Sequence, residues 1–168
     1  MNFYMTFGTV DYLHKTVTRH PNEQLLLMSN NDTGILFHET EDNSIFKEPK
    51  RYEVIDSTGG LPKNGFAVLN NIPVSDEGRP LFETRFKERA KLIEKEPGFA
   101  SIRVLRPANS DTYIILTFWD TEQYFKDWQQ SQAYNQAHKK RGTSDGVDQK
   151  SIFPRPSYVT TYYSVDIE

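Results

Sequence analysis

Short hydrophobic runs, separated by polar turns, mark the first third of the chain as rich in β-strand. Asn30–Gly34 is a turn signal, so the runs on either side of it predict a hairpin. Val10–Val17 is ambiguous, and its structure stays open. The predicted strands are Phe3–Thr9, Gln24–Met28, Ile35–Glu39 and, more weakly, Tyr52–Ile55.

A stretch rich in Gly, Pro and Ser, Ser57–Gly65, predicts a linker, and the pattern after it has a different rhythm. Apolar residues from Phe82 to Ile93 recur at helical spacing, and Pro97-Gly98 ends that helix. Asp120 is the expected N-cap of a second helix, with an interruption near Ser131. The predicted elements are a strand at Gly65–Val74, a helix at Glu77–Glu94, strands at Phe99–Leu105 and Thr112–Trp119, a helix from Asp120 to Lys140, and a strand at Tyr158–Val165.

This order, β-α-β-β-α-β, is that of the ferredoxin-like motif. We therefore predict an α+β fold with a ferredoxin-like unit in the C-terminal two-thirds, residues 63–168. An N-terminal β-rich segment, residues 1–62, would complete or flank its sheet, and it could be a diverged copy of the same strand set. Both helices of such a unit cover one face of the sheet. The other face must be covered by a partner subunit, the N-terminal segment or a ligand.

Composition and charge remove several classes of function. The net charge of −3 disfavours nucleic acid as a partner, because phosphate binding usually needs a basic excess. The absence of cysteine excludes disulfides, iron–sulfur clusters and thiolate ligation of haem iron. No apolar segment is long enough to span a membrane, and the first residues do not resemble a signal peptide. We expect a cytoplasmic protein.

Three motifs resemble those of a known enzyme group. They are the strand segment Val68–Ile72, the helical segment Phe125–Ser131, and Gln136–Lys139. Together they are similar to the antibiotic-biosynthesis-monooxygenase superfamily, and more closely to its haem-degrading, IsdG-type branch in the longer Bacillus form. The resemblance covers essentially the whole chain. It implies that haem is both cofactor and substrate, and that O2 and an external electron donor take part.

The resemblance also assigns three site residues. It implies that His138 is the axial ligand of the haem iron, that Trp128 pushes the porphyrin out of plane, and that Asn70 donates a hydrogen bond to oxygen at the iron. Each has an ordinary alternative: a solvent-facing histidine, a core tryptophan, and a strand-end asparagine bonded to backbone. Alternation places Asn70 and Asn71 on opposite faces of their strand, and the resemblance favours Asn70.

Phe66 and Val68 share the strand face of Asn70 and are candidates for lining an apolar haem pocket, with core packing as the alternative. The expected function is that of a haem-degrading monooxygenase, an oxidoreductase served by an external reductant or reductase. It would act as a homodimer or as an internally paired monomer. Two alternatives stay open: a non-catalytic haem-binding or signalling protein, and a cofactor-free monooxygenase of the same superfamily acting on aromatic or quinone substrates.

Overall fold

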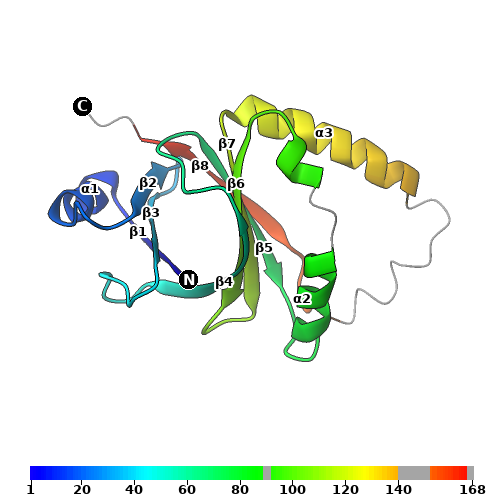
Figure 1. The fold of residues 1–168 in the computed structure, drawn as a ribbon, viewed down its shortest axis with the longest axis horizontal. Coiled ribbons are helices and arrows are strands. Elements are labelled where there is room, and N and C mark those ends of the chain that lie inside the picture. Colours follow the sequence, from blue (N-terminus) through cyan, green and yellow to red (C-terminus); the bar gives the residue numbers. More distant parts are fainter. Residues whose placement is uncertain (89–91, 140–151, 166–168) are drawn as a thin grey trace.

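The computed structural model describes residues 1–88, 92–139 and 152–165, with only the backbone of residues 88 and 132–139, and its strands close into a barrel (Figure 1). The elements are β1 (Asn2–Gly8), α1 (Val10–Arg19), β2 (Leu25–Ser29), β3 (Gly34–Thr40), β4 (Lys50–Thr58), β5 (Phe66–Pro73), α2 (Arg79–Glu88), a 3₁₀ turn η1 (Leu92–Lys95), β6 (Phe99–Pro107), β7 (Thr112–Trp119), α3 (Glu122–Lys139) and β8 (Tyr158–Ser164).

The barrel consists of two halves with the same strand order. Around it the strands run β4-β1-β3-β2 and then β8-β5-β7-β6, and β6 returns to β4. When the strands of each half are counted along the chain, their spatial order in both halves is fourth, first, third, second. All neighbouring strands are antiparallel. The N-terminal segment therefore supplies half of the barrel.

The two junctions between the halves differ in length. At one junction β4 pairs with β6 from Tyr52–Pro107 to Thr58–Ile102. At the other, β2 pairs with β8 only through Met28–Ser164 and Ser29–Tyr163. The Asn30 side chain extends this second junction by donating a hydrogen bond from Nδ2 to the Thr161 carbonyl, at 3.1 Å.

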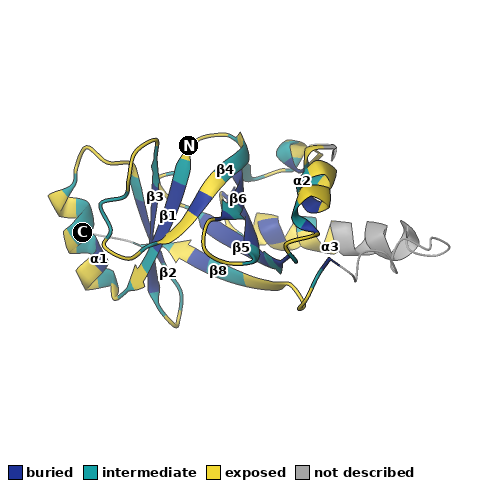
Figure 2. Ribbon diagram, turned by 90° about the horizontal axis from the view of Figure 1, so that it is seen from below, coloured by how far each residue is buried: buried dark blue, intermediate teal, exposed yellow. Residues whose placement is uncertain are grey.

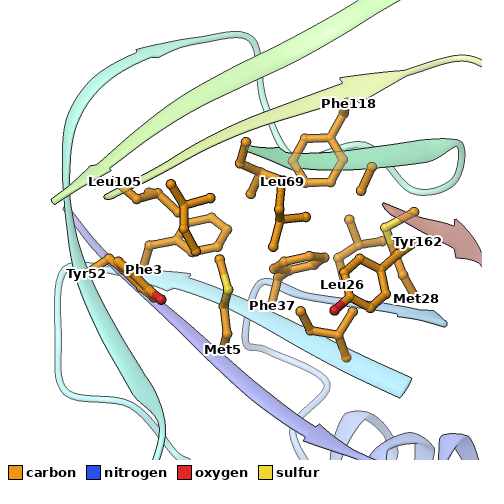
Figure 3. Close-up of a cluster of buried hydrophobic side chains, with 14 residues drawn as sticks. Phe3, Met5, Leu26, Met28, Phe37, Tyr52, Leu69, Leu105, Phe118 and Tyr162 are labelled. Carbon is orange, nitrogen blue, oxygen red and sulfur yellow. The ribbon is translucent and has the colours of Figure 1, made fainter. Parts of the chain in front are cut away.

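The main core fills the barrel, because alternate residues of every strand point inward. Figure 3 shows Phe37 and Phe118, which come from opposite halves, facing each other in this core with ring centroids 5.9 Å apart. Tyr52 lies at the rim of the same cluster. Burying large apolar side chains such as these stabilises the fold by about 1.5–3 kcal/mol each.

The helices cover the outer faces of the two halves at opposite ends of the molecule (Figures 1 and 2). Leu13 of α1 packs on Leu27 and Leu36 outside the N-terminal half. Phe82 of α2 and Phe125 of α3 pack on the outer face of the C-terminal half. This second outer layer positions the candidate site.

The fold class predicted from the sequence is confirmed, and each predicted strand is present. The interruption expected near Ser131 is absent, because α3 is continuous from Glu122 to Lys139. The expected N-cap is also wrong: Thr121 Oγ1 accepts the hydrogen bond from the Tyr124 amide, whereas the Asp120 amide donates to the Gly98 carbonyl. None of the described helices is long and apolar enough to cross a membrane.

Candidate active site

A cavity of about 270 Å³ lies between the outer face of the C-terminal half-barrel and its helices. Strands β5, β7 and β8 form one wall, and α2, η1 and α3 form the other. Most of the described lining residues are apolar, and none of these carries a charge. The lining residues are Val68, Asn70, Ile72, Phe86, Ile93, Ile115, Thr117, Phe125, Trp128, Gln129 and Val159.

Asn70 and Asn71 face opposite sides of β5, as alternation predicts. Asn71 is buried, and its Nδ2 donates to the carbonyls of Leu69 and Tyr158 at 3.1 and 3.2 Å and to Thr160 Oγ1 at 3.3 Å. Asn70 instead lines the cavity, and its carboxamide has no hydrogen-bond partner among the described residues. Asn71 therefore ties β5 to β8, whereas Asn70 is available to a ligand.

Trp128 of α3 combines tight packing with an unpaired polar atom. Its ring lies against Trp119 and Phe125, with centroid distances of 5.6 and 6.2 Å. Trp119 is itself held by a hydrogen bond of 3.0 Å from its Nε1 to Thr117 Oγ1. Trp128 Nε1 is buried and has no partner among the described residues. A buried N–H without an acceptor costs about 1–3 kcal/mol, so Trp128 is an energetically costly residue of the cavity wall.

A polar cluster fastens α2 to the sheet and so positions the Phe86 side of the cavity. Arg106 of β6 and Tyr113 of β7 both hydrogen-bond to the Glu83 carboxylate. Arg79 Nε donates to the Tyr113 hydroxyl at 3.2 Å. The hydrogen bonds from Arg106, with a smaller contribution from Tyr113, hold the pKa of Glu83 below its ordinary value despite partial burial.

Comparison with known proteins identifies this half of the chain. Residues 65–140 match the family described as antibiotic biosynthesis monooxygenase. The chain is 30% identical over 144 residues to the signal transduction protein TRAP of Staphylococcus epidermidis, covering 86% of each protein. The chain belongs to the antibiotic biosynthesis monooxygenase family.

Two further relatives of this family member match nearly its whole length. It is 25% identical over 158 residues to the heme-degrading monooxygenase of Listeria monocytogenes, covering 92% of this chain and 95% of that protein. It also resembles the solved structure of a major regulator of staphylococcal pathogenesis, with 26% identity, a TM-score of 0.85, and coverage of 99% of this chain and 100% of that one. The N-terminal half is thus part of what the relatives share.

The structure brings together three of the predicted site residues of this monooxygenase-family protein. Asn70, Val68 and Trp128 line one cavity. Phe66 shares their side of the sheet, but it is not among the described lining residues, because it packs between Phe125 and Tyr163 with ring centroids 5.9 and 5.1 Å away. His138 belongs to the last turn of α3, and its side chain lies outside the described part of the structure.

Several lining residues were not predicted as site residues. Phe86 and Ile93 carry a signal in the sequence, since both belong to the apolar stripe of the predicted helix and such a stripe faces the sheet. Thr117, Gln129 and Val159 carry no comparable signal. Among the described residues, no group of three or more histidines and carboxylates could by itself hold a metal ion.

Proposed function

We propose that this protein binds haem in the cavity between β5 and α3 and opens its porphyrin ring with O2 and electrons from an external reductant or reductase. The observation that carries the proposal is the pair of unpartnered polar groups, on Asn70 and Trp128, in an otherwise largely apolar cavity. The relative named heme-degrading monooxygenase, aligned over nearly its full length, supports the same reaction.

The chemistry of the cavity fits a flat, largely apolar ligand. The described lining offers apolar side chains to a macrocycle face and only three polar side chains, those of Asn70, Thr117 and Gln129. The volume of 270 Å³ lies just below the ~300–1,000 Å³ typical of small-molecule sites. A porphyrin therefore extends beyond this cavity, along α3 toward His138, which follows Trp128 by ~15 Å of helix axis.

Each of the three residues has a separate task in this proposal. The His138 imidazole would hold the iron, as the resemblance of Gln136–Lys139 to the haem-degrading branch implies. The Trp128 ring packs against Trp119, so its indole would keep its position when it contacts the ligand. Asn70 would donate a hydrogen bond that orients the oxidant toward one edge of the ring. Bound haem would supply the iron at which O2 is reduced and the ring that is oxidised.

A second function is favoured by the TRAP relative, which is named a signal transduction protein. In that case the chain would bind haem without degrading it. Both functions use the same cavity, so binding alone does not separate them.

Titration with haem in air, followed by addition of ascorbate and an iron chelator, tests the proposal. We expect a saturable Soret band that decays after ascorbate is added, with release of chelatable iron. A Soret band that persists through repeated additions would reject degradation and favour the carrier function.

Histidine variants test the iron ligand in the same assay. We expect His138→Ala to lose the absorption and electron paramagnetic resonance signature of histidine-ligated haem. His14→Ala, which changes a histidine on α1 at the other end of the molecule, is the matched control and should leave both spectra unchanged. An unaltered spectrum of His138→Ala would refute the assignment.

A further inference from the structure

A second cavity, of about 330 Å³, lies at one end of the barrel. The start of β4, the turn between β6 and β7, and the start of β8 surround it. It is on the opposite face of β5 from the haem cavity, because Asn71 and Tyr158 line this one whereas their neighbours Asn70 and Val159 line the other. The lining residues are Pro49, Lys50, Arg51, Tyr52, Asn71, Asn109, Ser110, Thr112 and Tyr158.

All charged residues in the described lining of this barrel-end cavity are positive. Lys50 and Arg51 line it, and no carboxylate is among the described lining residues. The Arg51 guanidinium has no ion-pair partner among the described residues, and Lys50 Nζ lies 5.4 Å from the centroid of the Phe7 ring. In a chain with a net charge of −3, this is a local concentration of unneutralised positive charge.

A buried phenol adds a directed donor to this charge. Tyr52 is only 7% exposed, and its ring belongs to the barrel core. Tyr52 lines the cavity, and its hydroxyl has no hydrogen-bond partner among the described residues. Burial, and to a smaller extent the neighbouring Tyr158, raises the pKa of Tyr52 to about 12, so this hydroxyl keeps its proton near neutral pH.

Asn71 and the β6–β7 turn supply further polar groups. Asn71 Nδ2 has three acceptors within 3.3 Å for its two protons, and these contacts fix its carboxamide. Ser110 Oγ accepts a hydrogen bond from the Thr112 amide at 3.2 Å, which leaves the Ser110 hydroxyl proton available as a donor. Asn109 adds an amide beside them.

We propose that the barrel-end cavity is a binding site for a small organic oxyanion, a hydroxylated carboxylate or a phosphate of ~10 non-hydrogen atoms or fewer. The negative group would lie between Lys50 and the Tyr52 hydroxyl, which belong to alternate residues on one face of β4, with Arg51 as a second positive charge at the rim. The hydroxyl and amide groups of Ser110 and Asn109 would bind the remainder of the ligand. The site is independent of haem binding.

Titration of the full-length protein with malate and, separately, with inorganic phosphate tests this proposal. Amide chemical shifts in two-dimensional NMR report where each probe binds. We expect saturable shifts at Tyr52, Asn71 and Ser110, without matching shifts at Val68 and Gln129 of the haem cavity. Saturation by malate alone identifies a carboxylate site, and saturation by both probes identifies a general oxyanion site. No saturation of these amides by either probe at millimolar concentration would overturn the proposal.

Two variants and a control make the test specific. Tyr52→Phe keeps the core ring and removes only the hydroxyl, and Lys50→Gln replaces the positive charge on the same strand face with a neutral polar side chain. We expect each to weaken binding of the responding probe about tenfold, as loss of one hydrogen bond to a charged group does. Arg19→Gln, an exposed arginine at the end of α1, is the matched control and should bind as the wild type does. Equal weakening in all three variants would mean diffuse electrostatic attraction and would reject a defined site.

Discussion

Asn70 and Asn71 are chemically identical neighbours that the pleat of β5 assigns to different surroundings. Asn71 points to the barrel side and is held by its hydrogen bonds to β8 and to its own strand. Asn70 points to the cavity between β5 and α3, where we propose that haem binds, and it is unpaired among the described residues. Substituting each in turn therefore separates structural from functional roles at nearly the same place.

For Asn70→Ala we expect haem affinity to change by less than about threefold and the rate of haem degradation to fall about 10–100-fold, as for loss of one oriented donor. For Asn71→Ala we expect a loss of stability and not a loss of activity. Its free energy of unfolding should fall by about 1–3 kcal/mol, while the folded fraction keeps its activity. Urea denaturation and single-turnover decay of the Soret band measure the two effects. Degradation by Asn70→Ala at the wild-type rate would contradict the assignment.

Trp128 allows a prediction about the shape of the bound ligand. Its stack on Trp119 gives the indole a firm backing, so a haem pressed against it should be distorted. We expect the out-of-plane resonance Raman bands of haem to weaken in Trp128→Ala and to be intermediate in Trp128→Phe, which keeps part of the bulk. An equally distorted haem in Trp128→Ala would show that the distortion has another source.

At this scale the sequence predicts a good part of the site. Strand periodicity alone separates Asn70 from Asn71, and the family resemblance selects Asn70 and Trp128. The surroundings of Phe66 could not be predicted in this way. That it shares a strand face with Asn70 does not reveal that Phe125 and Tyr163 pack against it. The unpaired Trp128 Nε1 could not be predicted from the sequence either. Whether this N–H has an acceptor depends on how the surrounding elements pack in three dimensions.

At the scale of elements, α2 is held by the Glu83 carboxylate. The pKa of Glu83 is lowered in the folded protein, so its ionised form adds stability above the ordinary pKa of about 4.5, and this stability is lost as the pH falls through the lower folded value. We expect the free energy of unfolding to drop between about pH 7 and about pH 3.5, and to drop less in Glu83→Gln.

Urea denaturation at the two pH values measures this effect. Glu77→Gln is the matched control, because Glu77 lies just before α2 and has no hydrogen-bond or ion-pair partner among the described residues. It should retain the pH dependence of the wild type. An identical pH dependence in Glu83→Gln would mean that this carboxylate does not stabilise the fold through its charge.

Elements with a sustained hydrophobic period were predicted correctly. The prediction was less successful where a capping residue determines the start of a helix. The structure of residues 10–17 stayed open in the sequence. In the structure they belong to α1, and Thr9 Oγ1 fixes the start of this helix by accepting a hydrogen bond from the Tyr12 amide. At α3 both Asp120 and Thr121 are good capping residues. The helix begins at Glu122, so Thr121 is the residue directly before it, and Thr121 Oγ1 accepts from the Tyr124 amide.

At the scale of the whole molecule, the decisive feature is that one chain supplies both halves of the barrel. The sequence predicted that something must cover the open face of the C-terminal sheet, but it could not identify the cover. Pairings such as Tyr52 with Pro107 join residues far apart in the chain, and no local pattern encodes them. The barrel-end cavity was missed for the same reason, since β4, β5 and β8 all contribute to it.

A fragment comprising residues 63–168 tests the role of the N-terminal half. Without residues 1–62 it would expose inward-facing Leu69, Leu105 and Phe118 on one continuous face. We expect this fragment to self-associate or precipitate, because so large an apolar surface is not stable in water. Size-exclusion chromatography with light scattering checks this against the full chain. A folded, monomeric fragment would contradict it.

The short seam between β2 and β8 has a kinetic consequence. A closed sheet has no free edge, so it separates first where the fewest backbone hydrogen bonds hold it, and here that place is the seam. Amide protons of β8 that face β2 should therefore exchange with deuterium sooner than those of β7 in the middle of its half-sheet. The effect should be confined to the end of β8 at Tyr163 and Ser164, because only there does this strand pair with β2.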